Sequence, residues 1–257
     1  MIMHQLNVLR SVAATMIEGG RGMMGTPNPN QPAKPIRLYE FEPSPFCRHV
    51  REVLTLLNLD VEIYPCPKNG TRFRPDVKAL AGKTQFPFLM DENTGVKLLE
   101  SQAIIDYLFK TYGTTGKTPK KWQNLAKIPV QGILVTIVAA RKGLKANPSN
   151  AGKAAPEQLL ELWSFETSPF SRLVRERLCE LELPYTLHNV GKERWQDMGP
   201  AVMRLKPGKY EPLAGGKRAL LLAENGQVQV PYLVDPNTGV SMYESKDILA
   251  YLDKTYG

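Results

Sequence analysis

The hydrophobic and polar positions of residues 36–113 predict a small unit that mixes strands and helices. Short apolar runs bounded by turn residues predict strands over 37–41, 61–65, 87–91 and 96–100. Apolar residues at helical spacing predict helices over 45–58 and 101–113. A crossover helix between the first two strands makes them parallel, and the hairpin that follows makes the sheet mixed. The unit therefore has the order βαβ-ββα around a four-stranded sheet.

The same pattern occurs a second time. The stretch 38–59 matches 162–183 at an offset of 124 residues, and 86–113 matches 230–257 at an offset of 144 residues. The difference of 20 residues (144 − 124) predicts an insertion within about 190–226 of the second copy. Internal repetition of this extent predicts a fold of class α/β with two tandem units.

Four regions follow from this repeat. They are an N-terminal helix and tether (1–35), a first unit (36–113), a linker with a short apolar helix (114–159) and a second unit (160–257). Residues 8–22 resemble residues 133–143, and a tether rich in Pro and Asn follows each, which favours a structural role for the N-terminal helix. The single acidic residue of residues 1–25, Glu18, with Arg10 and Arg21, equally suits the remnant of a transit peptide.

Composition restricts the partners. The net charge of +8 is spread along the chain, and no recognition motif for nucleic acid is present, so we expect no nucleic-acid partner. The basic charge leaves peripheral contact with a membrane surface open, whereas the absence of an 18-residue apolar run predicts no transmembrane helix. The oligomeric state does not follow from the sequence.

Three cysteines, at 47, 66 and 179, are too few for a disulfide framework and suit a reducing compartment. We expect Cys66 and Cys179 to be structural. Cys47 is either a small core residue, a thiol that forms a mixed disulfide, or part of a shared iron–sulfur site. The three histidines show no ligand spacing, so we predict no metal site.

Three motifs recur in both copies. Ser44 and Ser168 each precede a proline where a strand turns into a helix, an ordinary N-cap arrangement. Each copy then has an X-Pro pair before the hairpin and a Glu-Ser pair at the start of the last helix; these pairs are Phe86-Pro87, Val230-Pro231, Glu100-Ser101 and Glu244-Ser245. Alone, the prolines suit edge strands, and the serines of the last pairs suit helix caps.

Together, these motifs over about 36–113 and 160–257 resemble the N-terminal, thioredoxin-like domain of glutathione transferases. The Ser-Pro-Phe motif is similar to that of the tau type, and the tandem arrangement, with CPKNG at 66–70 and DPNTGV at 235–240, resembles plastid thioredoxin-family proteins of plants and green algae. The resemblance implies a chloroplast location and glutathione as co-substrate.

The resemblance also implies roles for single residues. Ser44 and Ser168 become the catalytic serines that donate a hydrogen bond to the glutathione thiolate, with Cys47 beside the first. The X-Pro pairs become cis-prolines that pair with the cysteinyl part of glutathione, and the Glu-Ser pairs hold its γ-glutamyl end. The arginines Arg48, Arg51, Arg172 and Arg175 lie at i, i+3 on the two helices. Either one of each pair faces an acid or the ligand, or the arginines lie on a solvated helix face, which is the environment we expect.

Two hypotheses follow. In the first, the protein is a glutathione-dependent enzyme that conjugates an unknown small electrophile or acts on peroxides or mixed disulfides. In the second, it is a non-catalytic binding module. The second hypothesis gains support because the helical domain that normally supplies the co-substrate pocket is replaced here by a second copy of the first.

Overall fold

The computed structural model describes residues 2–17, 19–124, 142–199, 205 and 208–257. Each unit repeats the same elements. In the first unit they are β1 (Ile36–Glu40), α2 (Pro45–Leu56), β2 (Val61–Pro65), α3 (Arg74–Ala81), β3 (Phe88–Asp91), β4 (Val96–Leu99) and α4 (Ser101–Tyr112). In the second unit they are β5 (Leu160–Ser164), α6 (Pro169–Glu180), β6 (Tyr185–Asn189), α7 (Lys217–Asn225), β7 (Tyr232–Asp235), β8 (Val240–Tyr243) and α8 (Ser245–Tyr256).

The pairing within each unit is the predicted one. β1 pairs in parallel with β2 and antiparallel with β3, which continues antiparallel into β4. β5, β6, β7 and β8 pair in the same way. The α/β class and the mixed sheets of two tandem thioredoxin-like units are therefore confirmed.

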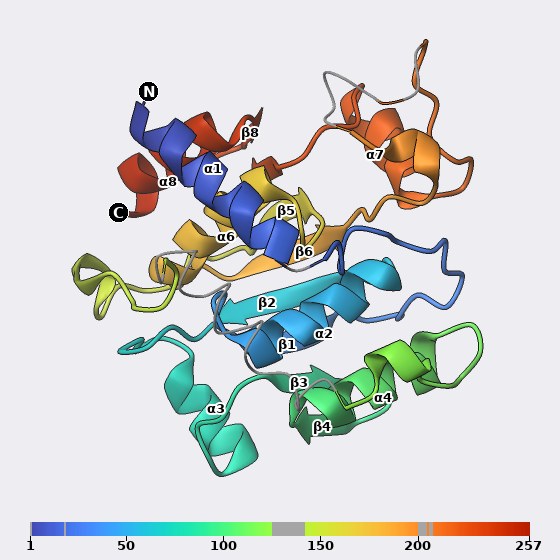
Figure 1. Cartoon of the computed structure of the whole chain (residues 1–257). Coiled ribbons are helices and arrows are strands. Elements are labelled where there is room, and N and C mark those ends of the chain that lie inside the picture. Colours follow the sequence, from blue (N-terminus) through green and yellow to red (C-terminus); the bar gives the residue numbers. More distant parts are fainter. Residues whose placement is uncertain (1, 18, 125–141, 200–204, 206–207) are drawn as a thin grey trace.

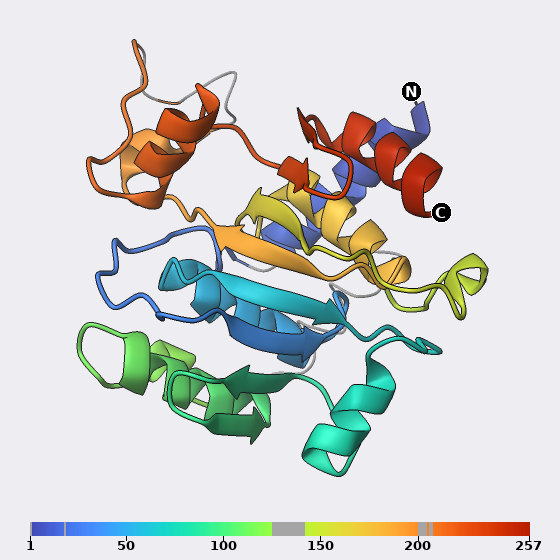
Figure 2. The same cartoon turned by 180° about the vertical axis from the view of Figure 1, so that it is seen from behind.

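The two units share one sheet. β2 pairs antiparallel with β6 through Val61↔Leu187, Glu62↔Thr186 and Ile63↔Tyr185. The strands thus form a single eight-stranded sheet of order β4-β3-β1-β2-β6-β5-β7-β8. Figure 2 shows β2 and β6 side by side at the centre of the molecule. An exposed strand edge is a template for pairing, and each unit covers the edge of the other.

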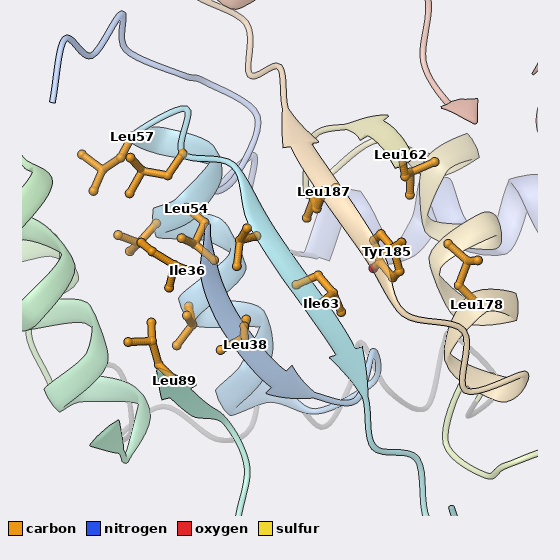
Figure 3. Close-up of a cluster of buried hydrophobic side chains, with 14 of the residues drawn as sticks. Ile36, Leu38, Leu54, Leu57, Ile63, Leu89, Leu162, Leu178, Tyr185 and Leu187 are labelled. Carbon is orange, nitrogen blue, oxygen red and sulfur yellow. The ribbon is translucent and has the colours of Figure 1, made fainter. Parts of the chain in front are cut away.

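Helices α2, α4, α6 and α8 cover one face of this sheet, and one apolar core runs beneath them through both units (Figure 1). Figure 3 shows Ile63 of β2 beside Tyr185 and Leu187 of β6 in that core. On the opposite face, α3 and α7 each cover a smaller apolar cluster, one around Tyr39 and Val77 and one around Trp163 and Leu221.

Helices α3 and α7 are absent from the sequence prediction, which treated both stretches as connecting segments. α3 buries only Val77 along its length, and α7 buries only Leu221 and Arg218, so neither shows a wide apolar stripe. Because α3 and α7 are equivalent, the insertion of the second unit lies between Lys192 and Lys217.

The N-terminal helix α1 (Ile2–Ile17) lies on the second unit, across α6 and beside α8 (Figure 1). Arg10 forms an ion pair with Glu176 of α6, with Arg10 Nη2 2.7 Å from Glu176 Oε2, and Thr15 Oγ1 donates to the Thr167 carbonyl at 3.0 Å. The tether first passes the second unit, where a Cβ on Gly191 would lie 2.5 Å from the Gly25 nitrogen. It then reaches the first unit, where the Thr26 N–H donates to the Leu56 carbonyl at 2.8 Å. The apolar helix predicted within the linker, at 128–140, lies outside the described residues.

Candidate functional site

The two Ser-Pro turns are built alike. Ser44 caps α2, with its Oγ accepting from the Cys47 N–H at 3.3 Å, and Ser168 caps α6, with its Oγ accepting from the Ser171 N–H at 3.3 Å. Proline at the first helical position has no N–H to satisfy and favours the helical φ. Capping uses the lone pairs of the serine oxygen, so the hydroxyl hydrogen remains for a ligand. Capping and a catalytic role are therefore compatible.

The peptide bonds Phe86–Pro87 and Val230–Pro231 are both cis, and each precedes the strand that pairs with the first strand of its unit. Each lies next to a Glu-bearing turn: Gln85 Nε2 donates to Glu100, and Gln229 Nε2 donates to Glu244. The X-Pro and Glu-Ser motifs of one unit thus lie side by side although 14 residues separate them in the sequence.

The Glu-Ser pairs differ from the expectation in one respect. The N-cap residues of α4 and α8 are Glu100 and Glu244, with φ of 71° and 65°, and the serine that follows is the first residue of the helix. The expected serine cap is therefore wrong. A non-glycine residue at positive φ stores backbone strain, which recurs at ligand-binding turns. The turn presents the first N–H groups of α8, which lack intrahelical acceptors.

In the second unit these motifs meet at one cavity of about 310 Å³. Ser168, Val230, Pro231, Glu244 and Ser245 all line it. All the residues predicted for a glutathione site in this unit are thus brought together. The other lining residues are Thr15, Met23, Phe165, Thr167, Pro169, Phe170, Lys192, Gly199, Arg218, Val228 and Gln229.

Sequence reasoning missed two cations of this cavity. Lys192 follows β6 and has its Nζ 3.1 Å from the Gly199 carbonyl, and Arg218 on α7 donates from Nε to the Gly191 carbonyl at 3.1 Å. The repeat carried a signal for them: Lys192 corresponds to Lys68 at the offset of 124, and Arg218 corresponds to Arg74 at the offset of 144. Arg74 donates to the Pro67 carbonyl as Arg218 donates to the equivalent Gly191 carbonyl, so the repeat marks a contact that both units share.

The N-terminal helix also reaches this cavity. Thr15 lines one side, and at the other end of the helix His4 Nε2 lies 3.4 Å from Ser245 Oγ. These contacts come from residues far from the second unit in the sequence, so no local pattern could have predicted them.

The cysteines are buried. Cys47 has no exposed surface, and burial raises the pKa of its thiol to about 12, although the Ser44 hydrogen bond opposes that shift. Burial likewise raises the pKa of Cys66 and of Cys179 well above the usual range. Among the three alternatives for Cys47, its burial favours the small core residue. Within the described ranges, no cluster of His, Cys, Asp and Glu is arranged to hold a metal ion.

The helix arginines are not on a solvated face, so that expectation is wrong, and the alternative holds instead: Arg51 and Arg175, one of each pair, face acidic residues. Arg51 and Arg175 are each 1% exposed and lie between the two units, where Arg51 binds Glu166 and Arg175 binds Glu42. Arg48 and Arg172 are buried as well. Their acidic partners belong in part to the other unit, which explains why the spacing on one helix gave no hint of burial.

The model of the glutathione S-transferase N-terminal domain matches this chain over residues 38–117 and 162–257. The two matches cover more than half of the chain, one in each unit. The chain therefore belongs to the glutathione S-transferase N-terminal domain family.

Among solved structures, two of a Bombyx mori glutathione transferase, BmGSTD1, one of them a complex, match at 34% identity and a TM-score of 0.30. Each match covers 33% of this chain and 39% or 38% of the other, so this chain spans well under half of that enzyme. No curated protein matches the chain. No helix in the described part of the chain has the length and apolar character needed to cross a membrane.

Proposed function

We propose that the second unit binds glutathione in its cavity and activates the thiol for transfer to a small electrophile. The observation that carries this proposal is the convergence of Ser168, Pro231, Glu244 and Ser245 on one cavity. Family membership supports glutathione as the ligand.

The charges of the cavity complement those of glutathione, which carries two carboxylates and one ammonium group at neutral pH. Lys192 and Arg218 line the cavity together with a single acidic residue, Glu244. In this proposal, Glu244 faces the ammonium group and the first turn of α8 receives the adjacent carboxylate. Lys192 and Arg218 attract the carboxylate at the other end of the peptide.

In this proposal, Ser168 acts on the sulfur of glutathione. It lies at the N-terminus of α6, where the positive end of the helix dipole stabilises a thiolate. A hydrogen bond from its hydroxyl to the charged form lowers the pKa of the bound thiol. The thiol proton is released to solvent as the thiolate forms. The thiolate sulfur then attacks the electrophilic carbon, a C–S bond forms, and the leaving group departs with its electron pair. Ser168 keeps its own proton throughout.

The protein's own thiols do not fit a redox cycle. All three cysteines are buried, and Cys47, the residue behind Ser44, has a thiol pKa raised to about 12. The thiolate is the reactive species. In this proposal the reacting sulfur is therefore that of glutathione, and peroxides or mixed disulfides would be reduced by glutathione itself.

Calorimetric titration with glutathione tests the proposal. We expect saturable binding below millimolar concentration in the wild type, with Ser245→Ala weakening the second site. Ser101→Ala, the equivalent substitution in the first unit, is the matched control and reports any binding there. If the wild type gives no heat of binding below millimolar glutathione, the proposal is wrong.

A turnover assay with a generic aryl electrophile separates an enzyme from a binding module. We expect conjugation that falls about tenfold to a hundredfold in Ser168→Ala, since a hydrogen bond to a charged group contributes roughly 1.5–3 kcal/mol. Binding without turnover in the wild type would instead establish the non-catalytic module.

The proposal also includes a similarity to the tau type and a location in plastids. The Ser-Pro-Phe motifs support a tau-like use of serine rather than cysteine at the reactive position. A plastid location rests on resemblance alone, and a fluorescent fusion of residues 1–35 tests it. Fluorescence that stays outside plastids would reject that location without touching the chemistry.

A further inference from the structure

Two hydroxyl groups lie in contact at the entrance of α6. Ser171 Oγ donates to Ser168 Oγ at 2.9 Å, and the backbone N–H of Ser171 donates to the same oxygen at 3.3 Å. Ser168 is 2% exposed and Ser171 is fully buried, so water does not compete for these bonds within the protein. Ser168 lines the cavity, whereas Ser171 is not among its lining residues.

We propose that Ser171 is a positioning residue that directs the hydroxyl hydrogen of Ser168 into the glutathione cavity. A serine oxygen has two lone pairs and one hydrogen. Both lone pairs of Ser168 Oγ are engaged from the same residue, one by the N–H and one by the hydroxyl of Ser171. The hydrogen takes the remaining direction, and because Ser168 lines the cavity whereas Ser171 does not, we assign that direction to the cavity. Rotation of the Ser168 hydroxyl away from the ligand would break the bond from Ser171.

The first unit offers a natural comparison, because Cys47 replaces Ser171 there. Ser44 Oγ accepts the backbone N–H of Cys47 at 3.3 Å, as Ser168 Oγ accepts that of Ser171. A thiol is a weak donor, so Cys47 cannot hold the Ser44 hydroxyl as Ser171 holds Ser168. The hydroxyl of Ser44 can instead turn toward the Cys47 sulfur, whose pKa that bond lowers against the larger effect of burial.

This inference rests on the proposed function and adds a difference between the two sites. In the second unit, Ser171 keeps the Ser168 hydroxyl directed at the thiolate of bound glutathione. In the first unit, the Ser44 hydroxyl points toward the Cys47 sulfur for part of the time. Glutathione bound in the second unit is therefore the more acidic of the two.

The test measures the pKa of the bound thiol, through the pH dependence of its ultraviolet thiolate absorbance, in the full chain. Ser101→Ala serves as the background so that the second site dominates. In that background, Ser171→Ala removes the donor and Ser171→Cys weakens it while keeping the side-chain size. The groups with charge or protons around the cavity, Lys192, Arg218, Glu244 and the nearby His4, are the same in all variants.

We expect the bound-thiol pKa to rise by about one unit in Ser171→Ala, with Ser171→Cys in between, and kcat/KM at pH 7 to fall about tenfold while KM for glutathione changes less than about twofold. A residue with only a structural role would alter stability or KM but leave the thiol pKa in place. The converse change, Cys47→Ser in a Ser245→Ala background, should lower the thiol pKa of the first site.

An unchanged thiol pKa in Ser171→Ala overturns this inference. Should that variant fail to fold, Ser171→Cys decides in the same way, since it keeps the size of the side chain. Failure of the proposed function is distinguishable: it appears as absent glutathione binding in the wild-type calorimetry and removes both proposals. If glutathione binds normally but the thiol pKa does not depend on residue 171, only the positioning role of Ser171 is rejected.

Discussion

Arg51 of the first unit and Glu166 of the second form a two-point ion pair, with Nε 2.9 Å from Oε2 and Nη2 3.1 Å from Oε1. The repeat makes this contact reciprocal. Arg175, which corresponds to Arg51, binds Glu42, which corresponds to Glu166, through Nε at 3.2 Å and Nη2 at 3.0 Å. The two units are therefore joined by the self-complementary arrangement expected of a symmetric dimer, here within one chain.

Removal of one partner of this pair should destabilise the whole chain. Arg51→Ala leaves the Glu166 and Glu40 carboxylates buried with one cation fewer, and breaking a buried pair costs about 3–5 kcal/mol. Urea unfolding followed by circular dichroism measures the change. Lys83→Ala, at an exposed position, is the control and should stay within about 0.5 kcal/mol of the wild type. A loss in Arg51→Ala no larger than the control's would show that the pair does not hold the units together.

The same cluster predicts a dependence of stability on pH. Three carboxylates, Glu40, Glu42 and Glu166, share the two guanidinium groups. Burial raises the pKa of Glu40 to about 7, only partly offset by Arg51. Burial also acts on Glu166, but Arg175 and Arg51 outweigh it and lower the pKa of that carboxyl to about 2.

Glu40 and Glu166 contribute to the unfolding free energy with opposite dependences on pH. Glu40 holds its proton in the folded state up to about pH 7 but loses it near pH 4.5 when unfolded, so its contribution to stability is present below pH 4.5 and is lost as pH rises to 7. The contribution of Glu166 is present above pH 4.5 and is lost as pH falls toward 2. We expect the unfolding free energy to fall between pH 5 and pH 7.5, and Glu40→Gln to flatten that decline. A decline of the same slope in Glu40→Gln would place its origin in another residue.

The position of α1 on the second unit depends on Arg10. Its guanidinium is 2.7 Å from Glu176 Oε2, and both side chains are mostly buried. Arg10→Met should loosen α1 and increase hydrogen–deuterium exchange over residues 2–17, while exchange in α2 stays unchanged. Gln5→Ala, at an exposed position of the same helix, should leave the exchange of α1 as it is. Equal protection in all three proteins would mean that apolar contacts alone hold the helix.

The cysteines should be inert in the folded protein. At a thiol pKa of about 12, the thiolate fraction of Cys47 near neutral pH is roughly 10⁻⁴ or less, against a few per cent or more for an ordinary cysteine. Labelling with a chromogenic disulfide should be slow in buffer and rapid for all three thiols in denaturant. Fast labelling of Cys47 in the native state, absent in Cys47→Ala, would restore the mixed-disulfide alternative for that residue.

The fold of one unit could be predicted from the sequence because its signals are local. Short apolar runs mark the strands, helical spacing marks α2 and α4, and the turn ENTG at 92–95 marks the hairpin. The short helix α3 was missed because only Val77 of it is buried. The joining of β2 to β6 was missed because pairing between strands more than a hundred residues apart leaves no local pattern.

In the candidate site, too, residues with a local motif could be predicted, whereas contacts between distant parts of the chain could not. Ser168, Pro231 and the Glu-Ser pair follow from motifs, and the structure brings them together. A solvated face was expected for Arg51 and Arg175 because one acidic partner of each, Glu166 and Glu42, lies 115 or 133 residues away in the other unit. Thr15 and His4 reach the cavity only because α1 packs on the second unit.

The central claim is that the sulfur of glutathione lies against Ser168 in the cavity of the second unit. A crystal structure of the chain with glutathione measures this directly. We predict the sulfur within hydrogen-bond distance of Ser168 Oγ, the ammonium group at Glu244 and the adjacent carboxylate at the start of α8. Glutathione bound away from Ser168, or an empty second cavity at saturating glutathione, would contradict the account.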